Sequence, residues 1–392
     1  MVKSIKGMRL GSYVSHSSAG ETYKAFVPAP LPPNPPLEMG RLYKPLDKAM
    51  NAIGRLDALA KLLPDIGLFL YMYVRKEALL SSQIEGTQSS LSDLLLFESH
   101  EKTDVLTDDV EEVSNYIAAL NHGLKRMKAG FPLSARLIRE MHAILLRGGR
   151  GSNKAPGEFR RSQNWIGGTR PGKARYVPAP PERVAELISD LEKFIHDDQR
   201  KLPALVKASL IHVQFETIHP FLDGNGRLGR LLITLLLYAS ETLTQPILYL
   251  SLYLKENRQT YYELLQDVRT KGDWEGWCEF FLDGVAEVAA QASIDAKKIL
   301  DLLERDCARI STIGRVSRSA LKIHGYLLKK PFLSITKAAK ALKLSVPTTT
   351  NAVLKLVEIG LLKELTGHSR NRLFAYTKYL VILTAGTEPL KS

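Results

Sequence analysis

The stretch that decides the fold reads His219-Pro220-Phe221-Leu222-Asp223-Gly224-Asn225-Gly226-Arg227-Leu228-Gly229-Arg230. An amphipathic run at 204–215 precedes it, and an apolar run at 231–239 follows it. Each run is long enough to form a helix. The stretch therefore predicts a loop that leads directly into the N-terminus of a helix.

The side chains of this loop suit a phosphate ligand. Gly224 and Gly226 permit a tight turn whose backbone N–H groups, next to a helix N-terminus, bind anions. Arg227 and Arg230 are three residues apart and share a helix face, where guanidinium groups grip phosphate oxygens. A carboxylate and an imidazole add a hard ligand for Mg²⁺ and a base that works near neutral pH. Together they predict phosphoryl or nucleotidyl transfer.

The same stretch resembles a known family signature, because it fits H-x-F-x-[DE]-G-N-G-R-x-x-R, the Fic motif, at every specified position. The resemblance implies a protein adenylyltransferase that transfers AMP from ATP to a Tyr, Thr or Ser hydroxyl of a protein, possibly its own, using Mg²⁺ or Mn²⁺. It implies that His219 is the catalytic base and Asp223 the metal ligand. The residues implied to bind nucleotide are Gly224, Asn225, Gly226, Arg227, Leu228, Gly229 and Arg230, with Asn225 on the α-phosphate or metal shell, Arg227 on the β-phosphate and Arg230 on the γ-phosphate.

A second element resembles the inhibitory helix of the same family, whose pattern is [ST]-x-x-x-E-[GN]. Ser81, Glu85 and Gly86 fill this pattern upstream of the motif, as in the N-terminally inhibited class. Ser81 and Glu85 lie one helical turn apart, and Gly86 is a typical helix C-cap. We expect Glu85 to pair with Arg230 and so to oppose binding of the γ-phosphate. The alternative is a helix carboxylate that faces solvent.

Segment 151–181 is rich in glycine and proline and predicts a β-hairpin. In Fic proteins a hairpin flap at this place binds the main chain of the target, and the residues that best match its edge are Asn164, Trp165, Ile166 and Gly167. A hairpin without a ligand role is the alternative. Residues 167–173 also fit G-x4-G-K, but Ala174 replaces the Ser or Thr and no helix follows, so we reject a P-loop.

Two tyrosines follow the motif helix. Tyr261 and Tyr262 resemble the aromatic pair that closes on the nucleotide in the family. Helical spacing does not separate the two, although Tyr262 is slightly favoured. An ordinary core aromatic is the alternative at either position.

The charge is distributed unevenly along the 392 residues. The net charge is +13, and residues 315–392 contribute +11 of it, with fourteen basic against three acidic side chains. Such asymmetry predicts a separate module that meets a polyanion. Residues 317–359 read as three helices, and two short alternating runs at 361–365 and 373–376 then enclose a basic tip.

This order predicts a winged helix-turn-helix that binds DNA, with a winged helix used for protein contact or dimerisation as the alternative. The candidate DNA-binding residues are Thr348, Thr349, Asn351, Arg370 and Arg372.

The predicted fold is an all-α Fic fold with a β-hairpin flap, followed by the C-terminal winged helix-turn-helix with its small β wing. We expect a Pro-rich, irregular N-terminal arm at 1–40, a helical region with the inhibitory helix at 41–130, a catalytic domain at 131–310 and the winged helix at 315–385. Docking of the arm on the body is favoured over a disordered tail, because aromatic and apolar residues interleave with its prolines.

Several functional classes are excluded or left open. About eighteen uninterrupted apolar residues are needed for a membrane span, and none occur; no secretory signal is apparent, and Cys278 and Cys307 form no disulfide or metal pattern. We expect a cytoplasmic protein, with a homodimer plausible from its apolar helix faces. The alternatives to adenylyl transfer are a Fic enzyme that uses another nucleotide or removes AMP, and a DNA-binding transcriptional regulator whose Fic-like body senses a nucleotide.

Overall fold

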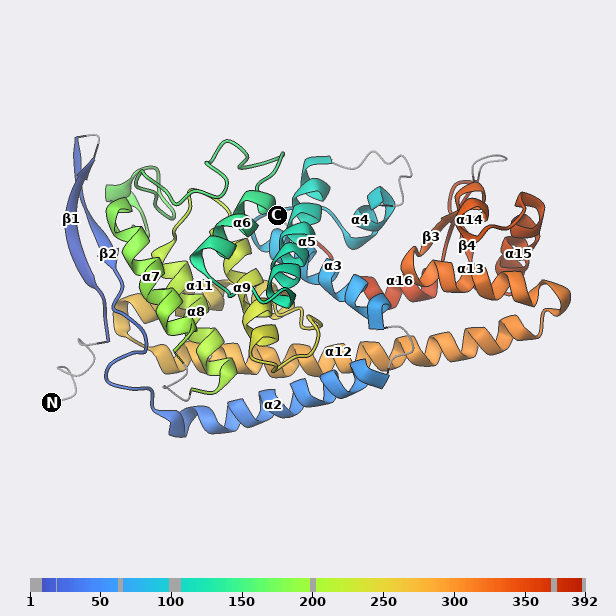
Figure 1. The fold of residues 1–392 in the computed structure, drawn as a ribbon, viewed down its shortest axis with the longest axis horizontal. Coiled ribbons are helices and arrows are strands. Elements are labelled where there is room, and N and C mark those ends of the chain that lie inside the picture. Colours follow the sequence, from blue (N-terminus) through green and yellow to red (C-terminus); the bar gives the residue numbers. More distant parts are fainter. Residues whose placement is uncertain are drawn as a thin grey trace.

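The computed structural model describes residues 9–18, 20–62, 66–98, 107–197, 202–367 and 372–389. The described chain is mostly helical and elongated, with a helical body at one end and a smaller unit at the other (Figure 1). Helix α12 (Trp274–Ser311) runs along the molecule and connects the two. None of the described helices is long and apolar enough to cross a membrane.

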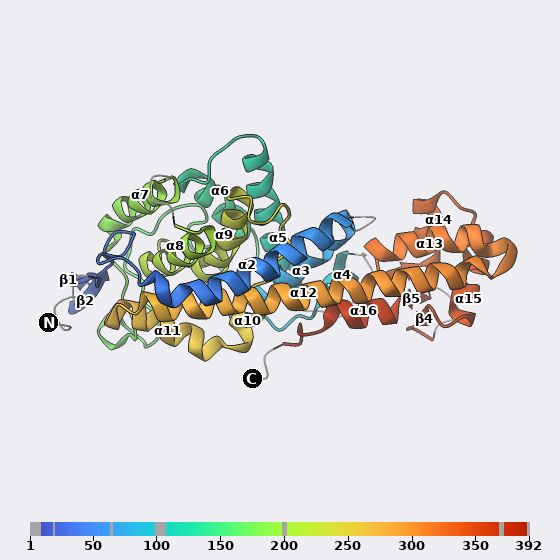
Figure 2. The same cartoon turned by 90° about the horizontal axis from the view of Figure 1, so that it is seen from below.

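Helix α2 (Met39–Leu62) lies along α12, as both views show (Figures 1 and 2). It begins the predicted helical region, and it buries Ala49, Ile53, Leu56 and Ala60, whose spacing of three and four residues keeps one apolar face on α12. Pro45 lies inside this helix, where it cannot donate the hydrogen bond that a backbone N–H would give to the Arg41 carbonyl.

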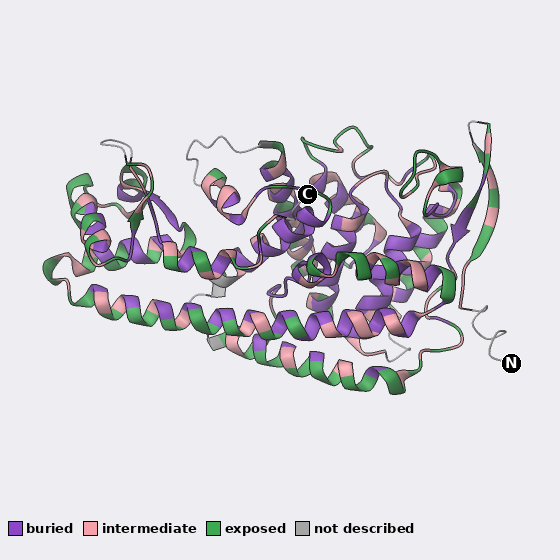
Figure 3. Cartoon of the chain, turned by 180° about the vertical axis from the view of Figure 1, so that it is seen from behind, coloured by how far each residue is buried: buried purple, intermediate pink, exposed green. Residues whose placement is uncertain are grey.

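The rest of the body is a bundle around α8 (Ala204–Ile218) and α9 (Asn225–Ala239), which are buried on nearly every side (Figure 3). The helices that surround this pair are α3 (Ile66–Ile84), α4 (Leu91–Glu98), α5 (Thr107–Lys128), α6 (Ala135–Leu145), α7 (Val184–Ile195), α10 (Ser251–Glu256) and α11 (Arg258–Lys271). Ser134 is the N-cap of α6, because its side chain accepts a hydrogen bond from the Leu137 N–H.

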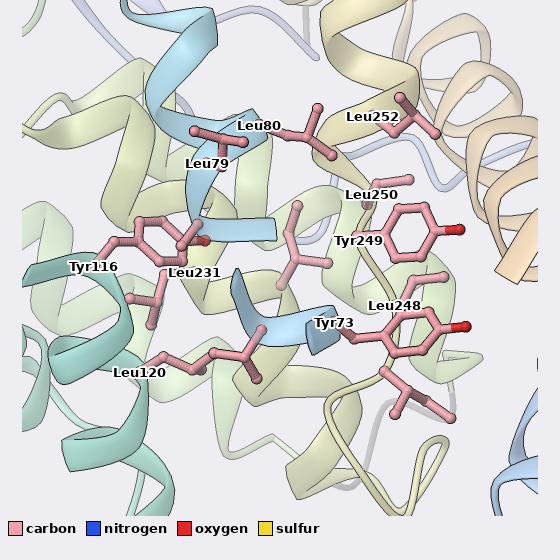
Figure 4. Packing of buried hydrophobic residues seen from close by; sticks show 14 of the residues in the cluster. Tyr73, Leu79, Leu80, Tyr116, Leu120, Leu231, Leu248, Tyr249, Leu250 and Leu252 are labelled. Carbon is pink, nitrogen blue, oxygen red and sulfur yellow. The ribbon is translucent and has the colours of Figure 1, made fainter. Parts of the chain in front are cut away.

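The packing beneath α3 fixes where its C-terminal end lies. Figure 4 shows side chains of α3 and α5 meeting α9 and the segment that leads into α10. The contributing side chains include Tyr73, Leu79, Leu80, Tyr116, Leu120, Leu231, Leu248, Tyr249, Leu250 and Leu252, all of them buried. Helix α3 is thus held rigidly against the helix that opens with the motif.

The prediction of an irregular N-terminal arm is wrong at Ser12–Ser18 and Glu21–Val27. Strands β1 (Ser12–Ser18) and β2 (Glu21–Val27) form an antiparallel hairpin, which stands at the edge of the body (Figure 1). Tyr23 and Ala25 alternate inward, a period-2 pattern that the prolines downstream obscured. The Pro-rich stretch after it docks on the body as expected, since Ala29 O accepts a hydrogen bond from Gln214 Nε2 at 2.8 Å.

The predicted flap hairpin is reduced to one antiparallel bridge between Ile166 and Tyr176. Its turn contains a short 3-10 helix, η1 (Pro171–Lys173), and a second one, η2 (Pro181–Arg183), precedes α7. Glycines at the turn and prolines on either side limit the ladder to two hydrogen bonds.

The C-terminal unit contains the three predicted helices, α13 (Ser317–Lys329), α14 (Ile335–Leu342) and α15 (Val346–Glu358), after a 3-10 turn η3 (Gly314–Val316). Strands β4 (Lys363–Glu364) and β5 (Leu373–Ala375) are also present. A third strand, β3 (Phe332–Ser334), pairs with β5 to give the antiparallel order β3-β5-β4. That this unit is a winged helix stays a prediction, as do the proposed domain boundaries.

Two elements of this unit were not predicted. Strand β3 has three residues, too few for a periodic signal. Helix α16 (Thr377–Thr384) reads TKYLVILT, whose β-branched residues favour a strand in isolation. It is helical because it packs against α12 and α3, where tertiary contacts override propensity.

Candidate functional site

The motif forms a loop and a helix start, as predicted. Helix α8 ends at Ile218, and His219 takes a left-handed conformation with φ of 50°. Helix α9 then begins at Asn225, behind Gly224 with φ of 76°. A non-glycine residue rarely adopts this conformation, so the turn that presents the imidazole is strained.

Asn225 holds the loop closed. Its Oδ1 accepts a hydrogen bond from the Phe221 N–H at 2.9 Å, and its Nδ2 donates to Phe221 O at 2.8 Å. Asn164 Nδ2, at the start of the flap, donates to the same carbonyl at 2.8 Å. Both polar atoms of the Asn225 side chain are engaged in shaping the loop, and its expected role on the α-phosphate or metal shell stays a prediction.

His142 also supports the loop, and no sequence pattern marked it. The Gly157 N–H donates to its Nδ1 at 2.8 Å, so its Nε2 carries the proton and donates to Asp223 O at 3.0 Å. Its ring stacks on Phe221 with 3.7 Å between centroids. Burial lowers the pKa of His142 to about 4, against the opposing effect of the Asp223 carbonyl, and the ring stays neutral.

Glu85 pairs with Arg230, as expected from the sequence. Arg230 Nη2 lies 2.7 Å from Glu85 Oε1 and donates to Ser81 O at 2.9 Å, while its Nε donates to Ser81 Oγ at 2.8 Å. Gly86 has a φ of 104° and lets the Thr87 N–H reach back to Ser82 O, which ends α3 there. The Nε and Nη2 atoms of the guanidinium are therefore both engaged by the last turn of α3.

Electrostatics strengthens this pair. Arg230 is buried, with 1% of its side chain exposed, whereas 33% of the Glu85 side chain remains exposed. Although burial acts against both charges, the Glu85 carboxylate raises the pKa of Arg230, and Arg230 lowers the pKa of Glu85. A Cβ atom at Gly226 would lie 2.3 Å from Glu85 Oε1, so glycine at this position is what admits the carboxylate.

Arg227 has a partner that sequence reasoning missed. Its Nη1 lies 2.6 Å from Glu112 Oε1 of α5, and both side chains are buried. Its Nη2 is 3.6 Å from Asp223 Oδ1. Glu112 looked like one acidic residue among several at the start of a helix, and only the packing of α5 on α9 brings it to the motif.

Asp223, the carboxylate of the motif, remains accessible to a ligand. Its side chain is 36% exposed, and its Oδ1 accepts a hydrogen bond from the Gly224 N–H at 2.5 Å. No group of three or more His, Cys, Asp or Glu side chains in the described ranges is arranged to hold a metal alone. A single exposed carboxylate fits Mg²⁺ whose other ligands are phosphate oxygens and water.

The two tyrosines are now distinguished. His212 Nδ1 donates to Gly229 O at 3.1 Å, so its Nε2 accepts a hydrogen bond from the Tyr261 hydroxyl at 2.9 Å. Tyr261 is therefore a core residue with a satisfied hydroxyl. Tyr262 stacks obliquely on it at 5.0 Å and stays half-buried, which leaves its ring the more accessible of the two.

A cavity of about 540 Å³ collects these groups, and its walls include Glu85, Ile166, His219, Gly226, Arg230 and Tyr262. It therefore unites an imidazole, a buried cation with its carboxylate, an aromatic ring and the flap. A larger cavity of about 880 Å³ lies beside Phe131 and Tyr238, away from the motif, and it gathers no such set of groups. We take the smaller cavity as the candidate active site because the chemistry converges there.

The flap residues border this cavity. Trp165, Ile166 and Gly167 line it, and the main chain of Ile166 exchanges two hydrogen bonds with Tyr176, at 2.8 and 3.1 Å. Trp165 is exposed. The flap thus presents an open edge and an exposed ring beside His219.

The candidate DNA-binding residues are distributed differently. Thr348 and Asn351 are exposed at the start of α15. Thr349 is fully buried and its hydroxyl donates to Ser345 O, so it belongs to the core and its prediction as a DNA contact is wrong. Arg372 lies 3.8 Å from Glu364, and Arg370 lies outside the described residues.

Comparison with known proteins agrees with this geometry. Residues 132–237 match the Fic/DOC family, and residues 43–125 match the Fic/DOC family N-terminal region. The chain therefore contains a Fic domain preceded by the N-terminal region of the Fic/DOC family. The protein adenylyltransferase Fic of Culex quinquefasciatus is 30% identical over 254 residues, which cover 62% of this chain and 45% of that protein. The protein of the same name from Aedes aegypti is 37% identical over 129 residues, which cover 32% of this chain and 23% of that one.

The chain thus spans less than half the length of these curated relatives. Among solved structures, a Fic family protein from Desulfovibrio desulfuricans G20 superposes with a TM-score of 0.57 at 22% identity, covering 86% of this chain and 95% of that one. Fic-1 (residues 134–508) of C. elegans gives a TM-score of 0.51 at 23% identity, covering 66% and 72%. At these identities the structures establish the fold.

Proposed function

We propose that this protein is a protein adenylyltransferase that transfers AMP from ATP to a Tyr, Thr or Ser hydroxyl of a protein. The observation that carries the proposal is one cavity in which His219 and Arg230 face the same space beside an open flap edge. The names of the curated relatives support it. The substrate class follows from the phosphate cradle and the base.

In the proposed reaction His219 removes the proton from the acceptor hydroxyl. The oxygen attacks the α-phosphorus in line, the bond to the bridging oxygen breaks, and pyrophosphate leaves. The N–H groups of 224–226 and the N-terminus of α9 offset the phosphate charge. Asp223 would hold Mg²⁺, which when bound neutralises phosphate charge. Arg230 would bind the γ-phosphate, and Arg227, oriented by Glu112, the β-phosphate.

The flap and the aromatic ring would complete substrate binding. An extended segment of the target would add to the edge at 164–167 through main-chain hydrogen bonds, which align the acceptor hydroxyl with His219. Tyr262 would cover the nucleotide, since Tyr261 is committed to His212.

We propose that Glu85 inhibits this reaction by occupying Arg230. A carboxylate at 2.7 Å takes the place of a γ-phosphate oxygen and repels the charged end of ATP. ATP that still entered would have its α-phosphorus displaced from the line of attack. A displacement of about 1 Å can cost about a hundredfold in rate.

The decisive experiment measures the intact mass of the purified protein after incubation with ATP and Mg²⁺, using the Glu85→Gly variant. A gain of one AMP group supports the proposal. Separate incubations with other nucleoside triphosphates test a different donor, and pre-modified protein tests removal of AMP. No mass gain with any nucleotide, together with specific DNA binding, would favour the regulator.

The C-terminal segment at 387–388 also supports the inhibitory helix and its neighbour α10. Gln83 Nε2 donates to Thr387 O at 2.9 Å, and Lys255 Nζ donates to Glu388 O. Both Gln83 and Thr387 are buried. We therefore expect deletion of residues 385–392 to loosen the last turn of α3 and to raise self-modification severalfold, less than Glu85→Gly does. Rates measured in the Glu85→Gly background provide the control, because the deletion should add nothing there.

We also propose that the C-terminal unit is a winged helix-turn-helix that binds DNA. Residues 315–392 carry a net charge of +11, and α15 presents Thr348 and Asn351 to solvent at its start. The wing between β4 and β5 would approach the phosphate backbone. A homodimer and a cytoplasmic location also stay predictions.

This proposal predicts a salt-dependent affinity for duplex DNA. The logarithm of the association constant should fall linearly with the logarithm of salt concentration, and Arg372→Ala should reduce the slope by about 1 if one phosphate contact is lost. Lys61→Ala, an exposed change on α2 in the body, is the matched control. Fluorescence anisotropy would measure both. An affinity that ignores salt, or no binding at all, would favour a protein partner.

A further inference from the structure

Two arginines outside the motif converge on the turn that carries His219. The last carbonyl groups of a helix have no partner within the helix, and cations near them are favoured. At the end of α8 these partners are Arg160, from the loop after α6, and Arg269, from α11. The two side chains come from segments more than one hundred residues apart and are both buried.

Arg160 grips the left-handed turn itself. Its Nε donates to His219 O at 2.9 Å, and its backbone N–H donates to Pro220 O at 2.9 Å. Its Nη2 donates to Ala179 O at 2.5 Å, which ties the turn to the segment after the flap. Arg160 therefore holds the carbonyl groups of two successive residues, His219 and Pro220.

Arg269 grips the preceding residues. Its Nη2 donates to Glu216 O and its Nε to Thr217 Oγ1, each at 3.2 Å. The guanidinium lies 3.9 Å from the centre of the Tyr176 ring, and the Tyr176 hydroxyl donates to Thr217 O at 2.6 Å. The flap strand and α11 thus meet at the end of α8.

Neither guanidinium forms an ion pair with a carboxylate within the described ranges. A buried cation without a counter-ion is costly, so its presence needs a compensating role. The charge of Arg160 and Arg269 is directed at helix carbonyls and at His219. We propose that Arg160 and Arg269 form a cationic clamp that positions His219 and keeps its imidazole neutral, ready to accept a proton. This role rests on the proposed transferase reaction.

The charged groups around His219 explain how the clamp keeps the imidazole neutral. Burial, then Arg269 and Arg160, lower the pKa of His219 to about 3. The Glu216 carbonyl on α8 and the Glu85 carboxylate at the end of α3 act in the opposite direction. Arg230 of α9 also lines the cavity. Removing one clamp cation should therefore raise the pKa of His219, and the imidazole would become protonated at a higher pH.

The test uses Arg269→Gln and Arg269→Lys, each combined with Glu85→Gly so that turnover is measurable. We expect Arg269→Gln to lower kcat about tenfold or more, to leave KM for ATP nearly unchanged, and to move the acid limb of the pH–rate profile to higher pH. Arg269→Lys keeps the charge but not the two hydrogen bonds, so it should lower kcat without moving the limb. Lys271→Gln, an exposed change on the same helix, is the matched control.

A second measurement needs no turnover. The pKa of the His219 ring can be followed by NMR titration, with its signal assigned by comparison with His219→Gln. This pKa should rise in both Arg160→Gln and Arg269→Gln, provided that each protein retains native circular dichroism. An unchanged titration would overturn the clamp even if transfer is confirmed. Equal losses in the Gln and Lys variants without a displaced limb would show a purely structural role. A raised pKa of His219 in a protein without transferase activity would refute the proposed reaction but support the electrostatic role of the two arginines.

Discussion

Replacing His219 by alanine is expected to lower AMP transfer by about 10² to 10⁴-fold, the range typical for loss of a general base. The imidazole lines the cavity, and burial with Arg269 and Arg160 keeps it neutral by lowering its pKa to about 3. A neutral ring has the unprotonated nitrogen that a general base requires. Transfer of labelled AMP from α-labelled ATP, measured in the Glu85→Gly background, gives the rate.

Nucleotide binding should survive the same change, since His219 donates no bond to the phosphate cradle in the proposed mechanism. His122→Ala is the matched control, because that imidazole pairs with Glu140 on the surface of α5 and α6. Undiminished labelling in His219→Ala would rule out this base. Loss of both labelling and ATP affinity would instead indicate collapse of the strained turn.

Replacing Glu85 by glycine should raise AMP transfer by about a hundredfold, because ATP could then align its α-phosphorus. The change frees Arg230 Nη2 from its 2.7 Å contact and leaves the two Ser81 hydrogen bonds in place. Initial rates of self-modification, and the affinity for a non-hydrolysable ATP analogue, would measure the effect.

Glu85→Gln separates charge from shape. The amide keeps the length of the side chain but cannot repel the γ-phosphate, so an intermediate gain is expected. No gain in either variant would mean that another contact limits the reaction. The thermal midpoint should fall in both variants, because Arg230 is buried, with 1% of its side chain exposed, and loses its carboxylate counter-ion.

The acid response of the inhibitory pair has a definite sign. Arg230 lowers the pKa of Glu85 against the opposing effect of burial, so the pair contributes stability above the unfolded-state pKa of Glu85. That contribution is lost as the pH falls through the lowered value. Inhibition by Glu85 should therefore persist throughout the neutral range.

Most helices could be predicted because their apolar residues recur at helical spacing. Helices α2 and α3 lie in the region predicted to be helical, and Pro64 and Gly86 interrupt the pattern near their C-terminal ends. The N-terminal hairpin was not predicted because nearby prolines dominated the composition of this segment. Helix α16 escaped because only its packing against α12 and α3 makes it helical.

The residues of the candidate site also differ in whether the sequence marked them. The motif and the Ser81-to-Gly86 pattern are local runs of residues, so both could be recognised in the sequence, and their resemblance to the family implied the pairing. Glu112, His142, Arg160 and Arg269 carry no local signal, because each is one ordinary residue on an element that packs against the loop. Asn225 carried a strong signal, yet its side chain serves the loop.

The sequence alone determined the resemblance to the Fic family and the loop that leads into α9, since the motif consists of residue types at short fixed separations. The pairing of Glu85 with Arg230 was expected from that resemblance. Only the tertiary structure decided how the loop is held. Helix ends leave carbonyl groups that must find partners, and α8 finds them in arginines distant in the sequence. It also decided that the end of the chain fastens Gln83, two residues before the inhibitory carboxylate. Such contacts depend on how helices pack, which no local pattern encodes.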